Sequence, residues 1–169
     1  MIPPSPWVVR HAQSIPARGK VLDLACGSGR HARFLAGLGY PVLAVDRDAG
    51  ALAGLSAIEG ITTRQLDLEG EEWPLAGQVF DGIVVTNYLW RPRLPDVLAL
   101  LAPGGALIYE TFMVGNAAYG KPSNPAFLFQ AGELRQLAAA AGLREVEYAE
   151  GYVASPKPAM RQAVCAIRD

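Results

Sequence analysis

Short runs of β-branched and aliphatic residues alternate along this chain with longer stretches rich in alanine and leucine. The short runs have the length and composition of β-strands, and the longer stretches are typical of helices. This alternation predicts a series of βαβ units. The predicted strands are 21–24, 42–45, 62–66, 79–86, 106–109, 145–148 and 162–167, and the predicted helices are 7–14, 30–38, 49–58, 94–101 and 132–141.

The order of these elements also predicts how the strands pair. Ile83, Val84 and Val85 are apolar at consecutive positions, as in a strand that helices cover on both faces. Only the Gly- and Pro-containing stretch 151–159 separates the last two strands, and no crossover helix fits there. These two strands are therefore expected to pair antiparallel. The predicted fold class is α/β, with a mostly parallel sheet and an antiparallel C-terminal hairpin.

Residues 111–131 show neither the helical nor the strand period. Irregular loops longer than about 12–15 residues are uncommon in compact domains and are usually functional or disordered. The aromatic residues in this stretch, among them Phe112 and Tyr119, argue against disorder. The stretch follows a central strand, so it should emerge at the carboxyl ends of the sheet, where open α/β folds bind ligands. We therefore interpret it as a lid or substrate loop.

Composition narrows the class of protein. The chain has 169 residues, 51% of them hydrophobic, and a net charge of −1, which fits one domain without a basic surface for a phosphate backbone. Residues 1–6 lack the regions of a secretory signal, and Pro103 interrupts the longest apolar stretch. Two cysteines form neither a disulfide framework nor a zinc site. We expect a cytoplasmic protein with no membrane segment and no metal.

The strongest motif is a strand, a Gly-x-Gly turn and a helix start, with the sequence VLDLACGSGRHA from Val21 to Ala32. Gly27 and Gly29 suit a turn where a ligand approaches the backbone more closely than a Cβ permits. The free N–H groups at the start of the helix would face the polar atoms of that ligand. The same spacing satisfies the G-x-G-x-x-G/A pattern of dinucleotide-binding proteins, so the motif alone leaves NAD(P) possible as the cofactor.

Three acidic residues favour a different cofactor. Asp23 lies inside the strand before the glycine turn, where it would repel a pyrophosphate but attract an ammonium or sulfonium group. Asp46 ends the second strand, where a carboxylate can accept both ribose hydroxyls. Asp67 ends the third strand, within reach of an adenine amino group. Acids at three successive strand ends suit S-adenosylmethionine better than NAD.

Two of these acids have an alternative interpretation. Asp46 and Asp48 both precede an apolar helical stretch, so either could cap that helix, with Asp48 the better placed. Asp67 precedes Glu69 and could be a solvated turn residue. His31, at a helix start, is interpreted as a polar residue at the surface or at the edge of a ligand rather than as a general base, and His11 as a surface residue.

The residues from Leu22 to Arg30 resemble the first motif of class I S-adenosylmethionine-dependent methyltransferases. Asp46, Asp67 and the runs 80–87 and 101–107 match the later motifs of that family in order. The continuation Gly-Ser-Gly-Arg-His and the stretch 130–134 resemble the small tellurite-resistance-type branch. The resemblance implies a Rossmann-like seven-strand fold. It divides the single domain into an N-terminal helical segment (about 1–17), a cofactor-binding half (about 18–86) and a substrate-side half (about 87–169).

The resemblance also implies a set of cofactor contacts. Asp23 and the backbone from Ala25 through Cys26 and Gly27 to Gly29 would hold the methionine moiety of S-adenosylmethionine. Asp46 would hold the ribose, with Arg47 beside the adenine. Asp67 and Leu68 would border the adenine, and Asn87 would lie near the sulfonium.

The sequence departs from the family pattern in two places. The connection 68–78 contains Gly70, Pro74 and Gly77, so the usual helix there must be short or missing. No Asn/Asp-Pro-Pro-Tyr/Phe motif follows the fourth strand, where the sequence reads TNYLWRP from Thr86 to Pro92. This second departure argues against methylation of an amino group on adenine or glutamine.

The sequence gives weaker evidence about which residues bind the substrate. Tyr88, Trp90 and Arg91 follow a central strand, where the substrate should lie, although Trp90 could equally pack against the next helix. Tyr119 in the irregular loop and Arg161 near the last hairpin turn are further substrate candidates, but exposed charges are usually only solvated. Glu110 and Tyr88 are the candidates for a general base, if one is needed. The alternative for Glu110 is a salt bridge to an arginine.

The sequence therefore predicts methyl transfer from S-adenosylmethionine by in-line displacement to an unidentified acceptor, with a small molecule as the expected partner. RNA or protein acceptors stay open. One rival is an NAD(P)-binding Rossmann oxidoreductase, which lacks the expected Tyr-x-x-x-Lys pair because Tyr119 is followed by Lys121. The other rival is a non-catalytic module that binds S-adenosylmethionine.

Overall fold

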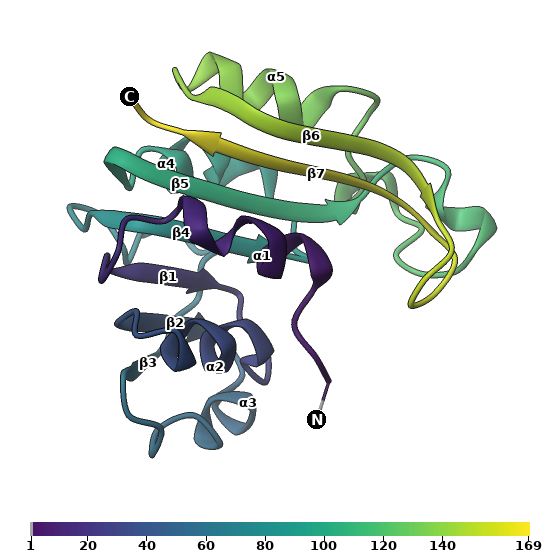
Figure 1. The fold of residues 1–169 in the computed structure, drawn as a ribbon. Helices are drawn as coiled ribbons and strands as arrows, with labels where there is room; N and C mark the ends of the chain where they lie inside the picture. Colours follow the sequence, from purple (N-terminus) through teal and green to yellow (C-terminus); the bar gives the residue numbers. More distant parts are fainter. Residues whose placement is uncertain (1) are drawn as a thin grey trace.

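The computed structural model describes residues 2–169, and Met1, the first residue of the predicted N-terminal segment, lies outside them. Its centre is one sheet with the strand order β3-β2-β1-β4-β5-β7-β6 (Figure 1). This arrangement confirms the predicted seven-strand fold. The strands are β1 (Val21–Leu24), β2 (Val42–Asp46), β3 (Ile61–Gln65), β4 (Phe80–Thr86), β5 (Leu101–Phe112), β6 (Arg144–Val153) and β7 (Ala159–Ile167).

The strand directions also agree with the prediction. Strands β1 to β5 pair in parallel, with Leu22 opposite Leu43 on one side and Ile83 on the other. Strand β7 lies between β5 and β6 and pairs antiparallel with both. The carboxyl ends of β1, β2 and β4 therefore meet at one edge of the sheet, at the right of Figure 1.

Helices cover both faces of the sheet (Figure 1). On one face, α1, α2 and α3 pack on a core that includes Val21, Ala44 and Val84. On the other face, α4 and α5 pack on a core that includes Leu22, Val45 and Val85. Adjacent residues of a strand enter opposite cores, which accounts for the continuous apolar runs. The helices are α1 (Pro6–His11), α2 (Arg30–Gly37), α3 (Ala49–Ala53), α4 (Leu94–Leu98) and α5 (Glu133–Ala140), with 3-10 turns η1 (Ala12–Ser14), η2 (Arg91–Arg93), η3 (Asn116–Ala118) and η4 (Pro125–Phe127).

Several predicted boundaries were wrong. Helix α3 ends at Ala53 because Gly54 caps it and turns follow. Helix α4 ends at Leu98, and Leu101, predicted to end that helix, begins β5, where it pairs with Phe80 and is buried. The first residue predicted for the fourth strand, Val79, lies outside β4 and is exposed.

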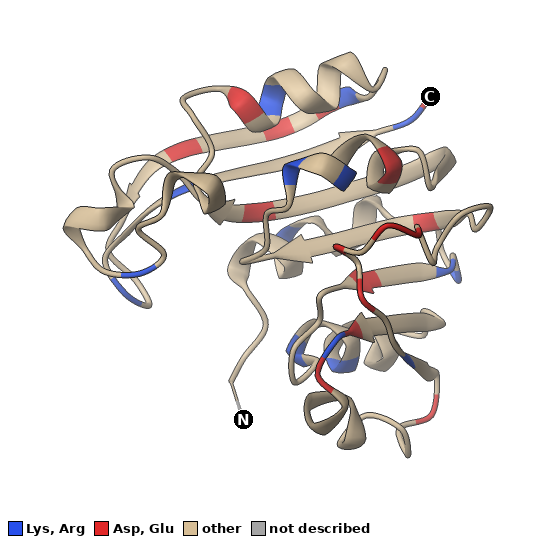
Figure 2. Cartoon of the chain, turned by 180° about the vertical axis from the view of Figure 1, so that it is seen from behind, with Lys and Arg blue, Asp and Glu red and all other residues tan. Residues whose placement is uncertain are grey.

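The connection between β3 and β4 consists of turns and bends, which confirms that the usual helix is missing there. Its apolar residue Leu75 is fully buried and fixes the connection against the core. The acidic residues Asp67, Glu69, Glu71 and Glu72 give this connection a run of negative charge, visible as the red coil in Figure 2.

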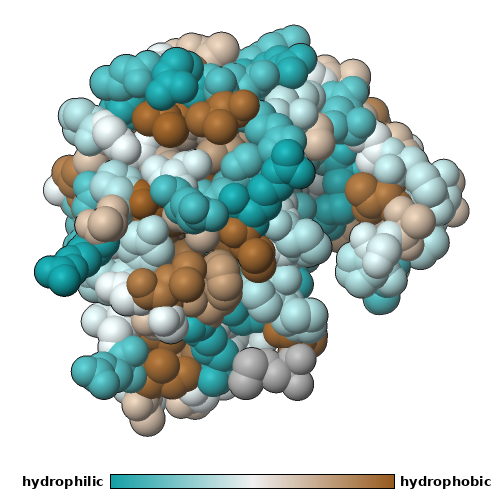
Figure 3. All heavy atoms as spheres, in the orientation of Figure 1, coloured by the Kyte–Doolittle hydropathy of each residue, from teal (hydrophilic) through white to brown (hydrophobic). Residues whose placement is uncertain are grey.

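The irregular stretch 111–131 is ordered around two short 3-10 turns. Its first two residues complete β5, and Met113 forms a bridge with Phe129 that draws its ends together. We call residues 113–131 and the β6–β7 turn 154–158 the projecting lobe. Figure 3 shows that this lobe stands out from the body at the carboxyl edge, with a hollow between them. None of the described residues forms a helix long and apolar enough to cross a membrane.

Candidate functional site

The glycine turn that follows β1 requires the backbone that its sequence predicts. Gly27 and Gly29 have φ of 55° and 81°, in the region that favours glycine. A Cβ added at Gly29 would lie 2.5 Å from the side chain of Leu55, so this position also needs glycine for packing. At Gly27 an added Cβ would meet nothing within 4 Å. The turn is therefore packed on the side of Gly29 and open on the side of Gly27.

Asp46 ties the end of β2 to this turn. Its Oδ2 accepts a hydrogen bond from the N–H of Gly27 at 2.9 Å, and its Oδ1 accepts one from the N–H of Asp48 at 2.9 Å. Asp48 caps α3 by accepting from Gly50 and Ala51, which confirms that it is the better cap. Asp46 thus fixes two strand ends relative to one another.

Asp23 is a buried carboxylate beneath the same turn. It is 1% exposed, and its Oδ2 has no hydrogen-bond partner among the described residues. Burial raises the pKa of Asp23 to about 7, with the nearby charge of Asp46 adding to the rise and the Ala32 main chain and Arg30 opposing it. An unpartnered buried oxygen of this kind fits a cationic or hydrogen-bond-donating ligand.

A cavity of about 520 Å³ opens at this edge of the sheet. It brings together six of the ten residues that the sequence predicts for the cofactor, whereas Asp23, Cys26, Gly27 and Gly29 are not among its lining residues. Its lining consists of Ala25, Asp46, Arg47, Leu66, Asp67, Leu68, Glu69, Asn87, Tyr88, Leu89, Thr111, Phe112, Pro122 and Phe127.

Ala25 and Asn87 line this cavity with positive φ values of 52° and 55°, which are uncommon for residues with a Cβ. Both positions directly follow a strand end, at β1 and β4, and so carry the sharp change of direction that exposes the backbone to the cavity. Such outliers cluster at ligand sites.

The acidic end of the cavity is organised by Asp67 and Glu69. Asp67 accepts the N–H of Glu69 at 2.9 Å, so it is a turn residue as well as a cavity wall. The Tyr88 hydroxyl donates to Oε2 of Glu69 at 2.9 Å. Burial, followed by this hydrogen bond and charge, raises the pKa of Tyr88 far above its usual value. Tyr88 therefore stays protonated at neutral pH, and its hydroxyl serves as a hydrogen-bond donor to Glu69.

A polar cluster beside the cavity joins three strands, and Asn87 and Phe112 connect it to the cavity lining. Arg161 of β7 donates from Nη2 to Oδ1 of Asn87 at 2.7 Å, and the same nitrogen lies 3.8 Å from Oε2 of Glu110 on β5. The guanidinium also lies over the ring of Phe112, 4.6 Å from its centre. The salt bridge anticipated as the alternative for Glu110 is thus present. Asn87, Glu110 and Arg161 form one cluster.

The N-terminal segment completes this cluster, which sequence reasoning missed. The hydroxyl of Ser5 donates to Glu110, and the N–H of Ser5 donates to Nε2 of His31 at 3.0 Å. Ser5 also caps α1, which is the one local signal that could have identified it.

The interpretation of His11 as a surface residue was wrong, and burial also excludes the surface alternative for His31. His31 is 2% exposed, and burial, with the charge of Arg30, lowers its pKa to about 4. It is therefore neutral and acts as a buried hydrogen-bond acceptor for Ser5. His11 is also buried, against Trp7 and 2.8 Å from Glu147. Each lies where α1 or α2 packs on the sheet, which no short sequence pattern reveals.

None of the four predicted substrate residues lines the cavity, although Arg161 contacts Asn87, which does. Trp90 precedes the turn η2. The guanidinium of Arg91 is bonded to Glu133 and to carbonyls of the projecting lobe. Tyr119 is half-exposed on the lobe and packs against Tyr152, with ring centres 5.2 Å apart. Cys26 and Cys165 are both unpaired, as expected.

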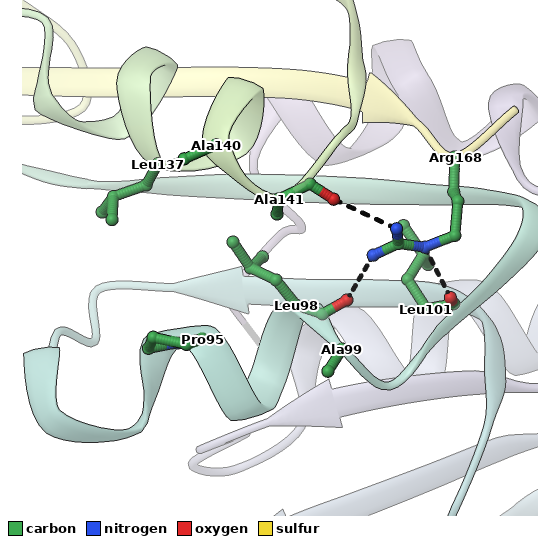
Figure 4. Close-up of a pocket in the computed structure, with 8 residues that line it drawn as sticks. All are labelled: Pro95, Leu98, Ala99, Leu101, Leu137, Ala140, Ala141 and Arg168. Atoms are coloured by element: carbon green, nitrogen blue, oxygen red, sulfur yellow. Dashed lines mark hydrogen bonds between the residues drawn. The ribbon is translucent and has the colours of Figure 1, made fainter.

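A second cavity, of about 530 Å³, lies between α4 and α5 (Figure 4). Apolar residues such as Leu98, Leu101 and Leu137 line most of it. Its one charged residue, Arg168, donates to the carbonyls of Leu98, Leu101 and Ala141 and so joins the ends of both helices to β5. No group of three or more His, Cys, Asp or Glu residues able to hold a metal occurs within residues 2–169.

The arrangement of strands and site matches a known class. A family model described as a methyltransferase domain matches residues 21–105, and the chain belongs to this family. The matched segment contains β1 to β4 and the glycine turn, so the match covers the cofactor end of the cavity.

Three comparisons define the class further. The structure of TehB from Haemophilus influenzae is 25% identical and superposes with a TM-score of 0.77 over 96% of this chain and 61% of that one. The Burkholderia thailandensis 1,6-didemethyltoxoflavin-N1-methyltransferase, solved with S-adenosylhomocysteine, is 23% identical with a TM-score of 0.70 over 96% and 76%. Hemagglutinin 1 of Eikenella corrodens is 32% identical over 154 residues, 85% of this chain and 50% of that protein. The chain spans about half the length of the curated relatives it matches.

These matches establish a class I S-adenosylmethionine-dependent methyltransferase fold of the tellurite-resistance type. The residues present fit S-adenosylmethionine as the cofactor. Asp23 offers an unpartnered buried oxygen, Gly27 leaves open space, and Asp46 and Asp67 line the cavity. The match decides between the predicted cofactors in favour of S-adenosylmethionine over NAD(P).

Proposed function

We propose that this protein transfers the methyl group of S-adenosylmethionine to a small acceptor that binds at the Asn87–Arg161 end of the cavity. The observation that carries the proposal is the convergence of Ala25, Asp46, Asp67 and Asn87 on one cavity at the carboxyl ends of β1 to β4. Each was predicted as a cofactor contact from a different motif.

We assign the cofactor to the acidic end of the cavity and the acceptor to the end at Asn87. Asp46, Asp67 and Leu68 are assigned to the ribose and adenine, and Asp23 with the backbone from Ala25 to Gly29 to the methionine moiety. When bound, S-adenosylmethionine supplies an activated methyl group on its sulfonium. The protein's own part is to orient the acceptor and to exclude water.

Charge supports the assignment of the acceptor end. The connection that follows β3 is acidic, whereas the projecting lobe contains Lys121 and Lys157 and no acidic residue. Figure 2 shows this contrast, with red along that connection and only blue on the loops at the far left. A cationic cofactor suits the acidic end and an anionic acceptor suits the end next to the lobe, where Arg161 places a cation beside Asn87.

We assign Glu110 a positioning role rather than that of a general base, because Ser5 and Arg161 both contact its carboxylate. An acceptor that arrives already deprotonated needs no base. Small soft nucleophiles such as thiolates and selenium or tellurium oxyanions meet this condition, and the tellurite-resistance-type resemblance points to the same class. Named relatives include tRNA, ribosomal RNA and protein methyltransferases, so their names do not select the acceptor.

The unpaired Cys26 and Cys165 support our expectation of a cytoplasmic location.

A ligand titration tests the cofactor half of the proposal. S-adenosylmethionine, S-adenosylhomocysteine and NAD(H) are added separately while the melting temperature is followed. A ligand at about 100 times its Kd adds roughly 2.7 kcal/mol of stability, or several degrees for a domain of this size. We expect a shift with both adenosyl ligands and a much smaller one for Asp46→Asn. A shift with NAD(H) alone would contradict the proposal.

Asp81→Asn is the matched control. Like Asp46, Asp81 accepts a hydrogen bond from a main-chain N–H. The donor is Lys20, at 3.0 Å, and the bond lies at the amino end of the sheet. Its variant should bind both adenosyl ligands like the wild type.

Release of S-adenosylhomocysteine in the presence of small thiols, selenite or tellurite tests whether the protein transfers the methyl group. Binding without release for any acceptor would favour the non-catalytic module.

A further inference from the structure

The projecting lobe forms one wall of the cofactor cavity through Pro122 and Phe127. The base of the lobe is fixed by buried side chains. Asn116 donates to the carbonyl of Pro122 at 2.9 Å and accepts the N–H of Met160, and Gln162 donates to the carbonyl of Gln130. The turn η4, which carries Phe127 at its end, lies between these points, and the main chain of Phe129 beyond it bonds to Phe112 and Val114.

Arg91 anchors the residues on either side of Phe127. Its Nη2 donates to the carbonyl of Leu128 at 2.6 Å, and its Nη1 lies 3.1 Å from the carbonyl of Ala126 and 3.4 Å from that of Pro125. These three carbonyls flank Phe127 on both sides. One guanidinium therefore defines the path of the backbone that presents the Phe127 ring to the cavity.

Glu133 fixes the orientation of that guanidinium. The two side chains form a bidentate pair, with Nε 2.7 Å from Oε2 and Nη2 2.8 Å from Oε1. Oε1 also accepts the N–H of Gln130 at 2.8 Å, so the pair closes the end of the lobe against the first turn of α5. A planar fork bonded on both edges has little freedom to turn.

The position of Arg91 in the chain connects the two walls of the cavity. Asn87, Tyr88 and Leu89 line the wall that follows β4, and Arg91 begins the next turn. The hydroxyl of Tyr109 donates to the carbonyl of Tyr88 at 2.6 Å, and its ring packs edge-on against Phe129 of the lobe. Movement of the lobe away from Arg91 would therefore separate Phe127 from the β4 wall.

We propose that Arg91 is a positioning residue, and that the Arg91–Glu133 pair holds Phe127 as a gate over the cofactor cavity and thereby sets how fast the spent cofactor leaves. The proposal rests on the proposed function for the identity of that cofactor. It replaces the sequence-based expectation that Arg91 contacts substrate, since lobe carbonyls and Glu133 use its donors.

Helix α5 supplies a matched control. Arg135 forms a bidentate pair with Glu145, with Nε 2.7 Å from Oε1 and Nη2 3.1 Å from Oε2. This pair has the same chemistry and begins on the same helix, but it contacts neither the lobe nor the cavity. Arg135→Gln therefore reports the effect of losing an ion pair of α5 without losing the anchor of Phe127.

Hydrogen exchange of the ligand-free protein tests the anchor itself. The N–H groups of Phe127, Leu128 and Phe129 donate to Asn124, Pro125 and Phe112. We expect Arg91→Gln to speed their exchange at least about fivefold and Arg135→Gln to leave it within about twofold, because only the first loosens this segment. Equal exchange in the two variants would overturn the proposal. Arg91→Lys, which keeps the charge but not the fork, should fall between wild type and Arg91→Gln.

The dissociation rate of S-adenosylhomocysteine tests the gate. We expect Arg91→Gln and Phe127→Ala each to raise this rate about tenfold, and the double variant to differ from either by less than about twofold, because Arg91 acts through Phe127. Additive effects, near a hundredfold in the double variant, would overturn the proposal. If the wild type binds no S-adenosylhomocysteine, the proposed function fails, and the exchange comparison alone decides whether Arg91 anchors Phe127.

Discussion

Arg161 and Asn87 lie 74 positions apart in the chain, yet Nη2 of one is 2.7 Å from Oδ1 of the other. Asn87 follows β4 and Arg161 belongs to β7, so the arginine side chain reaches across the end of β5, which separates these strands. The contact joins a residue predicted to lie near the cofactor to the last strand of the sheet, and it lies where we place the acceptor.

Arg161→Gln should separate acceptor binding from cofactor binding. The variant loses the cation beside Glu110 and the ring of Phe112 but keeps the cavity walls around Asp46 and Asp67. We expect the Kd of S-adenosylhomocysteine to stay within about threefold and kcat/KM for an anionic acceptor to fall about 10- to 100-fold. Calorimetry and initial rates measure the two quantities. An equal loss in both would place Arg161 in the cofactor site.

Stability should depend on pH through Asp23. Its folded pKa of about 7 lies above its ordinary value of 3.8, so the folded state binds this proton more tightly. The resulting stabilisation is complete below pH 3.8 and is lost as the pH rises to about 7, amounting to roughly 4 kcal/mol. Asp23→Asn should remove this dependence and unfold at higher urea than the wild type at pH 8. Parallel pH profiles for the two proteins would contradict the expectation.

The cofactor should follow the opposite trend. The ammonium of the methionine moiety favours an ionised Asp23, so affinity for S-adenosylmethionine should rise between about pH 6 and 8. Calorimetry in buffers of different ionisation enthalpy should detect a proton released on binding. Asp23→Asn should bind more weakly and release none.

The two glycines of the turn should respond differently to alanine. Gly29→Ala places a Cβ 2.5 Å from the side chain of Leu55 at a positive φ and should destabilise the fold by about 2–4 kcal/mol. Gly27→Ala has open space, so only the backbone term of about 1–2 kcal/mol applies. The Gly27 variant should nevertheless lose more cofactor affinity per unit of lost stability. Urea unfolding and ligand titration together decide this.

Arg168→Ala should affect stability without affecting the cofactor. Arg168 donates to the carbonyls of Leu98, Leu101 and Ala141 in the cavity between α4 and α5 (Figure 4). Removing these charge-assisted bonds to two helix ends and to the start of β5 should cost about 2–4 kcal/mol. The Kd of S-adenosylhomocysteine should stay unchanged, and a change would show that the two cavities are coupled.

The sequence predicted the sheet well because its signals are local. Buried parallel strands such as 83–85 are continuous apolar runs, and the glycine turn has a fixed spacing between strand and helix. The positions of Asp46 and Asp67 followed from the same logic, since strand ends of a parallel sheet share one edge. Boundaries failed where a tertiary contact decides, as at Leu101, whose pairing with Phe80 turns a helical apolar position into a strand.

The acceptor end was only partly predictable. Arg161 and Glu110 were candidates, but their contact with Ser5 and Asn87 depends on strands and a segment far apart in the chain. Arg91 shows the opposite problem. Its position after a central strand predicts a substrate contact, whereas Glu133 and the lobe carbonyls that occupy it lie more than thirty residues further along. No local pattern encodes such a partner.

The place of β7 between β5 and β6 has a consequence for the order in which the protein becomes functional. During synthesis β5 and β6 emerge before the strand that pairs with both, so the sheet stays open at this edge until residues 159–167 have left the ribosome. Arg161 belongs to that strand. The glycine turn and the acidic end of the cavity can therefore assemble first, while the acceptor end forms only in a finished sheet. If the acceptor binds beside Arg161 as we propose, a chain that has not yet paired β7 would hold the methyl donor before it could hold an acceptor.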